Sequence, residues 1–210
     1  YKGEIHAGTS NLYIPGGIGK WNGTSWDSLG LGVNGLVGCF FVYNNELYVG
    51  GRFDSAGTVP ANGLAKWDGT KWSDVYGLPH YNMSISNPNS INAIEFYNGE
   101  LYVAGNFEGP GNYKEIVRYD GSSWQTVGNG FIGAFASVGN LVVFNNELYA
   151  SGTFSQTENS ANPGNYIAKW DGTNWSPVDG GMDNSVVGLC VFNNELYAGG
   201  VFTNAGGTPA

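Results

Sequence analysis

A short phrase that begins and ends with an aromatic residue occurs four times in the chain and constrains the fold more than any other feature. Its copies lie at residues 21–26, 67–72, 119–124 and 170–175, and together they contain all seven tryptophans. Successive copies begin 46, 52 and 51 residues apart. A repeat of about fifty residues is typical of propellers, in which each repeat forms one sheet, or blade, of about four strands.

A second phrase, centred on Glu-Leu-Tyr, alternates with the first and ends in small residues such as Gly50-Gly51 and Gly199-Gly200. Its four clear copies begin at residues 45, 99, 146 and 194, and a degenerate copy begins at residue 3. The order of the phrases predicts four strands per repeat, which we call a to d. In the first full repeat we predict strand a at 37–43, strand b at 46–53, strand c at 63–68 and strand d at 71–76, with a variable loop at 54–62.

Both phrases contain residue pairs that favour two-residue hairpin turns with positive φ. Asn-Asn or Asn-Gly precedes each Glu-Leu-Tyr strand, and Asn-Gly or Asp-Gly lies inside each aromatic phrase. With Asp68-Gly69 at a two-residue tip, Trp72 would lie opposite the small Ala65. This register predicts that the tryptophan ring packs between stacked sheets. Strand a is apolar along its length, which predicts that both of its faces are covered.

These features predict an all-β propeller with three complete four-stranded blades and two partial ones. The approximate blades are 1–33, 34–77, 90–128, 136–178 and 185–210, where the first lacks strand a and the last lacks strands c and d. We expect a single propeller domain or a segment of a larger propeller. Joining the two ends would represent strand b twice, so we expect further chain or a partner protein to cover a terminal blade.

The glycine doublet that closes strand b, followed by aromatic residues on strands c and d, resembles a kelch repeat. Residues 47–51 with Trp67 and Trp72 show this pattern, although the kelch loop between strands c and d is usually longer. Residues 53–72 resemble more closely the repeats of large exported Bacteroidetes proteins with a type IX secretion sorting domain, and more distantly a fungal cortical marker family. The resemblance implies a bacterial protein that is secreted or lies at the cell surface.

Charge and composition argue against several functions. The formal charge of −9 opposes binding to nucleic acid, and no apolar stretch approaches the ~20 residues needed for membrane insertion. Cys39 and Cys190 lack metal-ligand spacing and are predicted to be small buried hydrophobic residues, with a disulfide between them left open. The only histidines are His6 and His80, and no nucleophile motif is present. We therefore predict no cofactor, no metal site and no catalytic residue.

Charged residues recur at fixed places in the repeats. We expect the strand b glutamates to bond turn amides or to remain solvated, rather than to form a cation-binding ring. The strand c cations are predicted to be rim charges on the side opposite the tryptophans. The glutamates are Glu4, Glu46, Glu100, Glu147 and Glu195, and the cations are Lys20, Lys66, Arg118 and Lys169.

The loops between strands b and c differ in length and composition, and a rigid repeated frame commonly places recognition in such loops. The predicted binding residues lie in or beside these loops and in the long segment after residue 78: Arg52, Asp54, Tyr81, Asn106, Tyr113 and Thr153. The residues with a structural role in the repeat are Trp21, Trp26, Trp67, Trp72, Trp124, Trp170, Trp175, Gly50, Gly51, Gly199 and Gly200.

We interpret the chain as a non-catalytic module that binds other proteins or glycans, or as a rigid scaffold. Its partners would be other protein chains or remaining blades of a parent protein. The alternative is the propeller portion of a secreted enzyme whose catalytic residues lie partly outside this chain. A lectin with one sugar site per blade would need equivalent b–c loops, and these loops differ.

Overall fold

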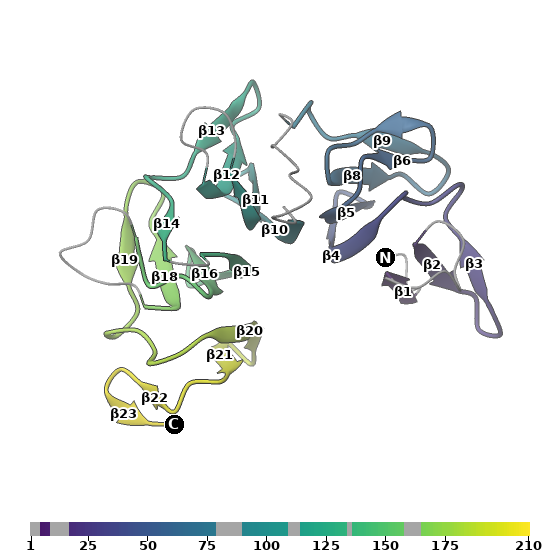
Figure 1. Ribbon diagram of the computed structural model, residues 1–210. Helices are drawn as coiled ribbons and strands as arrows, with labels where there is room; N and C mark the ends of the chain where they lie inside the picture. The colour runs from purple at the N-terminus through teal and green to yellow at the C-terminus, as the bar shows by residue number, and fades with distance from the viewer. Residues whose placement is uncertain (1–4, 9–16, 79–89, 109–113, 134–135, 158–164) are drawn as a thin grey trace. The chain divides into compact units, whose positions relative to one another are not determined.

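The structure, a computed structural model, describes residues 5–8, 17–78, 90–108, 114–133, 136–157 and 165–210. The chain forms two compact units, Tyr1–Ile94 and Glu95–Ala210. All regular elements in the described ranges are β-strands (Figure 1). This agrees with the predicted all-β fold.

Three sheets have four strands each, in the order a-b-c-d. The first contains β4 (Leu36–Tyr43), β5 (Glu46–Arg52), β8 (Leu64–Trp67) and β9 (Trp72–Asp74). The second contains β10 (Ser90–Tyr97), β11 (Glu100–Glu108), β12 (Lys114–Tyr119) and β13 (Trp124–Thr126). The third contains β15 (Val138–Phe144), β16 (Glu147–Gly152), β18 (Ile167–Trp170) and β19 (Trp175–Pro177).

Two further sheets contain only part of this pattern. Before the complete sheets lies one of strands b, c and d, made of β1 (Ile5–Gly8), β2 (Ile18–Trp21) and β3 (Trp26–Ser28). After them lies a pair of strands a and b, made of β20 (Val186–Phe192) and β21 (Glu195–Gly200). The chain thus has the three complete and two partial blades that the repeats predicted.

The turns between strands a and b have the predicted geometry. Asn44 and Asn45 have φ of 48° and 61°, and Tyr43 pairs directly with Glu46 across the two-residue turn. Positive φ recurs at both turn residues of the other three copies. Asn and Gly tolerate this left-handed conformation at low cost, and it matches the twist of the flanking strands.

The predicted turn between strands c and d was wrong. Trp72 pairs with Trp67, and Ala65 pairs with Asp74, so the loop has four residues instead of two. The side chain of Asp68 explains the longer loop, because its Oδ1 accepts the amides of Thr70 at 2.8 Å and Lys71 at 2.9 Å. Asn22, Asp120 and Asp171 bond their own loops in the same way.

The strand d tryptophan nevertheless lies between sheets. Trp72 is 6% exposed within a core shared by the β1–β3 sheet and the first complete sheet. Its Nε1 donates to the carbonyl oxygen of Leu29 at 2.8 Å, just beyond the end of β3. In the second unit, Trp175 Nε1 donates to the Val127 carbonyl at 3.1 Å. In both cases the strand d tryptophan of one sheet therefore forms a hydrogen bond to the backbone of the connection that follows strand d of the preceding sheet.

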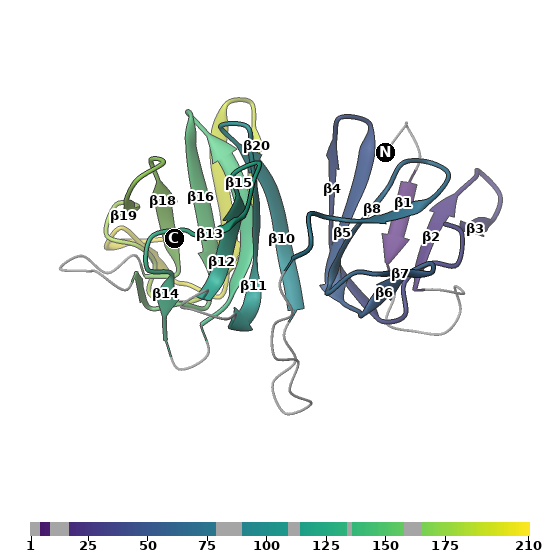
Figure 2. The ribbon, with the colours of Figure 1, turned by 90° about the horizontal axis from the view of Figure 1, so that it is seen from above.

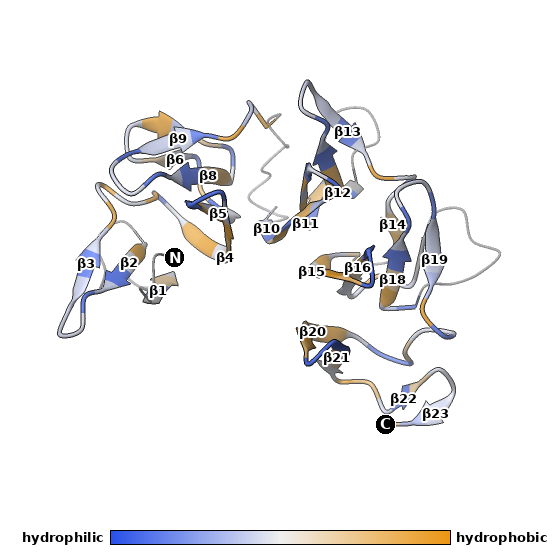
Figure 3. Cartoon of the chain, turned by 180° about the vertical axis from the view of Figure 1, so that it is seen from behind, coloured by the Kyte–Doolittle hydropathy of each residue, from blue (hydrophilic) through white to orange (hydrophobic). Residues whose placement is uncertain are grey.

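Strand β4 is only partly covered, contrary to the prediction for strand a. Figure 3 shows that β4 is largely hydrophobic, yet Leu36 is 44% exposed and Val42 is 48% exposed. The order of strands in its sheet places β4 at an edge, paired on one side with β5. A strand at the edge of a sheet has a hydrogen-bonded neighbour on one side only, so the other side of β4 is open.

Small strand pairs lie in the loops and were not predicted. In the loop between β5 and β8, β6 (Ser55–Ala56) pairs with β7 (Val59–Pro60) as a separate two-stranded sheet. Their equivalents after β21 are β22 (Asn204–Ala205) and β23 (Thr208–Pro209). In the second unit, β14 (Phe131–Ile132) pairs with β17 (Gln156–Thr157). Figure 2 shows the β4–β5 turn at one end of the first unit and the β6–β7 pair at the other end.

Candidate binding surface

Three of the predicted binding residues occupy one position of the repeat. Arg52, Asn106 and Thr153 each lie six residues after the strand b glutamate, at the end of their strand that leads into the b–c loop. Arg52 and Asn106 are half-buried, whereas Thr153 is exposed. Asp54 follows Arg52 into the loop and is exposed, so these two candidates share one loop end. Tyr81 and Tyr113 lie outside the described residues.

The connections that precede β4 and β20 hold the following b–c loops in place. Asn34 Oδ1 accepts the amides of Asp54 at 2.8 Å and Ser55 at 3.0 Å. The amide of Gly57 donates to the Gly32 carbonyl at 2.7 Å. Such side-chain bonds to backbone amides replace water as the partner of a loop and fix its conformation.

The last loop has the same arrangement with a stronger acceptor. Asp183 Oδ1 accepts the amides of Thr203 at 2.8 Å and Asn204 at 3.0 Å, and its Oδ2 accepts the Thr203 hydroxyl and the Asn204 side-chain amide. Bonds from the Asn204 and Thr203 side chains, followed by their amides, hold the pKa of Asp183 well below its usual range. We call these two acceptors, Asn34 and Asp183, the loop clamps.

The sequence analysis missed the loop clamps, although a signal for them existed. Asn34 and Asp183 occupy equivalent places, each ten residues before the first Asn of an Asn-Asn turn. It also missed Glu115, which is 7% exposed and has φ of 54°. Its Oε2 accepts the amide of Phe131 at 3.3 Å, so the carboxylate ties strand c to the next connection. The equivalent residues just before strand c in two other sheets, Gly17 and Gly63, are glycines with positive φ. The repeats therefore gave no reason to expect a buried glutamate at this position.

The strand b glutamates of the three complete sheets form ion pairs, which corrects the expectation that they bond turn amides or remain solvated, and Glu4 lies outside the described residues. Glu46 Oε2 lies 2.9 Å from Lys66 Nζ, and Glu147 Oε2 lies 3.0 Å from Lys169 Nζ. Glu100 pairs with Arg118. The register explains these pairs, because Tyr48 lies directly opposite Lys66 and Glu46 lies two residues earlier on the same face.

A tyrosine completes each of these charged groups. The hydroxyl of Tyr48 donates to Glu46, that of Tyr102 to Glu100 and that of Tyr149 to Glu147. Burial, together with the Glu100 carboxylate, raises the pKa of Tyr102 to about 12. The phenols therefore remain protonated at neutral pH and act as donors, not as bases. We call each glutamate, tyrosine and cation of one sheet a triad.

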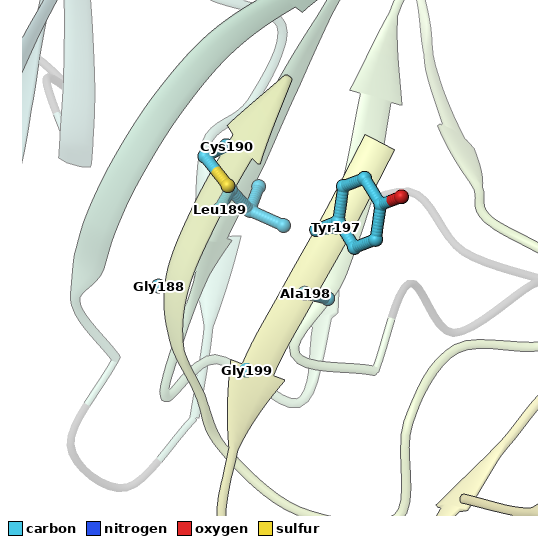
Figure 4. Close-up of a pocket in the computed structure, with 6 residues that line it drawn as sticks. All are labelled: Gly188, Leu189, Cys190, Tyr197, Ala198 and Gly199. Carbon is cyan, nitrogen blue, oxygen red and sulfur yellow. The ribbon is translucent and has the colours of Figure 1, made fainter. Parts of the chain in front are cut away.

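The last sheet carries an open depression of about 370 Å³. Figure 4 shows Cys190 and Tyr197 on the two strands that line it, with Gly188, Leu189, Ala198 and Gly199 beside them. Cys190 is exposed here, contrary to the prediction that both cysteines are buried. Cys39 lies on β4 at the place that Gly188 occupies on β20; it donates to the Ile91 carbonyl at 3.9 Å, and burial raises its thiol pKa to about 12. Both thiols are free.

Comparison with known families decides the class of this chain. Residues 27–195 match the family described as the Rax2 C-terminal beta propeller domain. The chain belongs to this β-propeller family. No curated protein sequence matches the chain.

Among solved structures, this propeller resembles the computationally designed Ika8 protein, with 13% sequence identity and a TM-score of 0.52. The match covers 93% of this chain and 52% of the designed chain, so this chain spans about half the length of its structural relative. At this identity the likeness supports the fold alone.

The described part of the propeller contains few groups suited to catalysis or to metal binding. Within it, no three His, Cys, Asp or Glu side chains come together as metal ligands. No helix in the same part of the chain is long and apolar enough to cross a bilayer. The described structure instead presents b–c loops that differ from one another, each at the same end of a similar sheet.

Proposed function

We propose that this propeller is a non-catalytic binding module or rigid scaffold of a larger secreted or cell-surface protein, and that its b–c loops contact another protein or a glycan. The observation that carries the proposal is the pair of loop clamps. A loop fixed by its clamp loses little conformational entropy when it binds, which favours affinity. The kelch-like phrase and the resemblance to exported Bacteroidetes repeats support the location and the route through type IX secretion.

The test exchanges one loop for its equivalent in the same chain. Residues 54–61 (DSAGTVPA) are replaced by the sequence of residues 203–210 (TNAGGTPA). Both segments form a pair of two-residue strands, and the incoming amides can still reach Asn34. The exchange therefore alters the exposed side chains and preserves the frame.

Binders are first selected on a glycan array and from a displayed peptide library, and are then titrated against both proteins. We expect unchanged thermal unfolding and at least a tenfold loss of affinity, about 1.4 kcal/mol, for binders that use this loop. Binders that are indifferent to exchange of every described loop would contradict the proposal. Turnover of an arrayed glycan would instead favour the secreted enzyme.

A further inference from the structure

The pair Asn-Gly occurs five times in the chain, and the structure gives the copies different hydrogen bonds. The amide nitrogen of the residue after an asparagine can attack the side-chain carbonyl carbon, Cγ, of that asparagine. Glycine favours this attack because no Cβ shields its nitrogen. The copies are Asn22-Gly23, Asn34-Gly35, Asn62-Gly63, Asn98-Gly99 and Asn129-Gly130.

Two of the copies have an asparagine side chain that is held by backbone amides. Asn22 Oδ1 accepts the amides of Thr24 and Ser25, both at 2.9 Å, and its Nδ2 donates to Asp27 at 3.0 Å. Asn34 is a loop clamp whose Oδ1 accepts two amides of the b–c loop. These bonds fix the side chains, so several of them must break before either Cγ can be attacked.

In two other copies the attacking amide is itself bonded. The amide of Gly63 donates to the Phe53 carbonyl at 2.7 Å, and the Asn62 side chain also donates to a backbone carbonyl at 2.8 Å. The amide of Gly130 donates to the Val127 carbonyl at 3.3 Å. A nitrogen that is held in this way must leave its acceptor before it can react.

Asn98 and Gly99 form the whole connection between β10 and β11, and both are exposed. Among the described residues, neither the Asn98 side chain nor the Gly99 amide has a hydrogen-bond partner. The other three a–b turns have the same positive φ at both residues but contain Asn-Asn. This turn therefore combines an unshielded nitrogen with a side chain that no described group holds.

We propose that Asn98 is the site at which the folded chain undergoes spontaneous deamidation. The Gly99 nitrogen forms a bond to Asn98 Cγ, the bond from Cγ to Nδ2 breaks, and Nδ2 leaves as ammonia with the proton of the Gly99 amide. Water then opens the cyclic imide at one of its two carbonyls. The product at position 98 is an aspartyl residue or an isoaspartyl residue, and water is the sole co-reactant.

Either product adds a negative charge to the turn, and the isoaspartyl form also adds a carbon to its main chain. The turn precedes β11 at Glu100, whereas the b–c loop follows β11 at Glu108. The modification therefore acts at the end of the strand away from the proposed binding loop. The inference goes beyond the proposed function and does not depend on it.

The test incubates the whole 210-residue chain in mildly alkaline buffer and follows all five asparagines by peptide mass spectrometry. We expect Asn98 to react about tenfold or more faster than Asn22 and Asn34, because at least two hydrogen bonds hold each of those side chains. In guanidinium chloride the fold is lost, and these differences should largely disappear. Equal rates in the folded chain, or the same differences in the unfolded chain, would overturn the proposal.

A variant tests the role of the unshielded nitrogen. Gly99→Asn gives this turn the Asn-Asn pair of the other a–b turns, in which Asn45 and Asn146 have φ of 61° and 62°. A Cβ added at Gly99 meets no heavy atom within 4 Å, so the variant should keep the native melting temperature. We expect the loss of the Asn98 amide to slow about tenfold or more while Asn129 reacts as before. An unchanged rate at Asn98 in the variant would contradict the proposal.

Discussion

The two aromatic residues of each c–d hairpin face each other, and their surroundings depend on the neighbouring sheet. Trp67 and Trp72 have ring centroids 5.2 Å apart, and Trp21 and Trp26 are similar at 5.4 Å. Trp72 is 6% exposed against the connection that follows β3, whereas Trp26 is 43% exposed. The same phrase therefore carries a buried and an exposed tryptophan, which provides a matched pair for mutation.

Trp72→Ala should lower the free energy of unfolding by about 3–5 kcal/mol, because it removes a large side chain from a packed core and a buried hydrogen bond. Urea unfolding followed by circular dichroism measures this loss. Trp26→Ala is the control and should cost much less. Equal losses in the two variants would show that Trp72 does not pack between sheets.

The stability of the chain should contain a contribution from Glu95 that falls as pH rises. Burial raises the pKa of this carboxyl to about 7. The unfolded chain releases the proton near pH ~4.3 whereas the folded chain keeps it, so folding must take up a proton and becomes less favourable as pH rises from that value to about 7. Glu95→Gln should remove this decline, as measured by urea unfolding at several pH values. If the decline persists in the variant, another group causes it.

At the scale of single residues, the sequence predicts what depends on backbone preference and misses what depends on side-chain bonding. Asn44 and Asn45 adopt the predicted positive φ, which an Asn-Asn pair favours in a two-residue hairpin turn. The Asp68 turn differs because its carboxylate bonds two amides of a longer loop. For the same reason no local pattern indicated that Asn34 would accept amides 20 and 21 residues away.

Among the elements, the b–c loops differ most from one another and depend on the clamps. Asp183→Asn should remove an acid-sensitive part of the stability. The pKa of Asp183 is lowered in the folded state, so its contribution is complete above the unfolded value near pH ~3.9 and is lost as pH falls below it. Thermal unfolding between pH 2 and 6 measures the effect. An acid decline of equal size in both proteins would contradict the role of the clamp.

The triads predict that calcium does not change the thermal stability of the chain. Each described glutamate of a complete sheet already has a cation on its own sheet, so the carboxylates do not share a site. Neither added Ca²⁺ nor EDTA should change the melting temperature. A bound ion at a hundred times its Kd would add about 2.7 kcal/mol, so a rise of several degrees with Ca²⁺ would restore a metal site.

The strands were predictable from the repeats because their alternation and turn residues are local. Predicted strand a at 37–43 and strand b at 46–53 correspond to β4 and β5 within a residue. Strand d proved shorter, at Trp72–Asp74, since the Asp68 loop takes residues that a two-residue turn would have left to the strand. The two-residue strands of the loops carry too few residues to form a recognisable pattern.

For the whole molecule, the repeats establish the propeller family and leave the ligand unassigned. The predicted binding residues Arg52, Asn106 and Thr153 are placed at equivalent loop ends by the frame, yet their side chains differ in chemistry. The fold follows from what the repeats share, whereas the proposed recognition would depend on the loops in which they differ. A single sequence contains only one example of each loop, so the partner remains a proposal.

Amide hydrogen exchange across the four described Glu-Leu-Tyr strands tests most directly the central claim that the chain repeats one sheet in which strand b lies between strands a and c. Strands β5, β11 and β16 are paired on both sides, whereas within the described residues of these 210 β21 is paired with β20 alone. We predict that the amides of β5, β11 and β16 exchange slowly and that about half of those in β21 exchange quickly. Equal protection of all four strands would contradict the account.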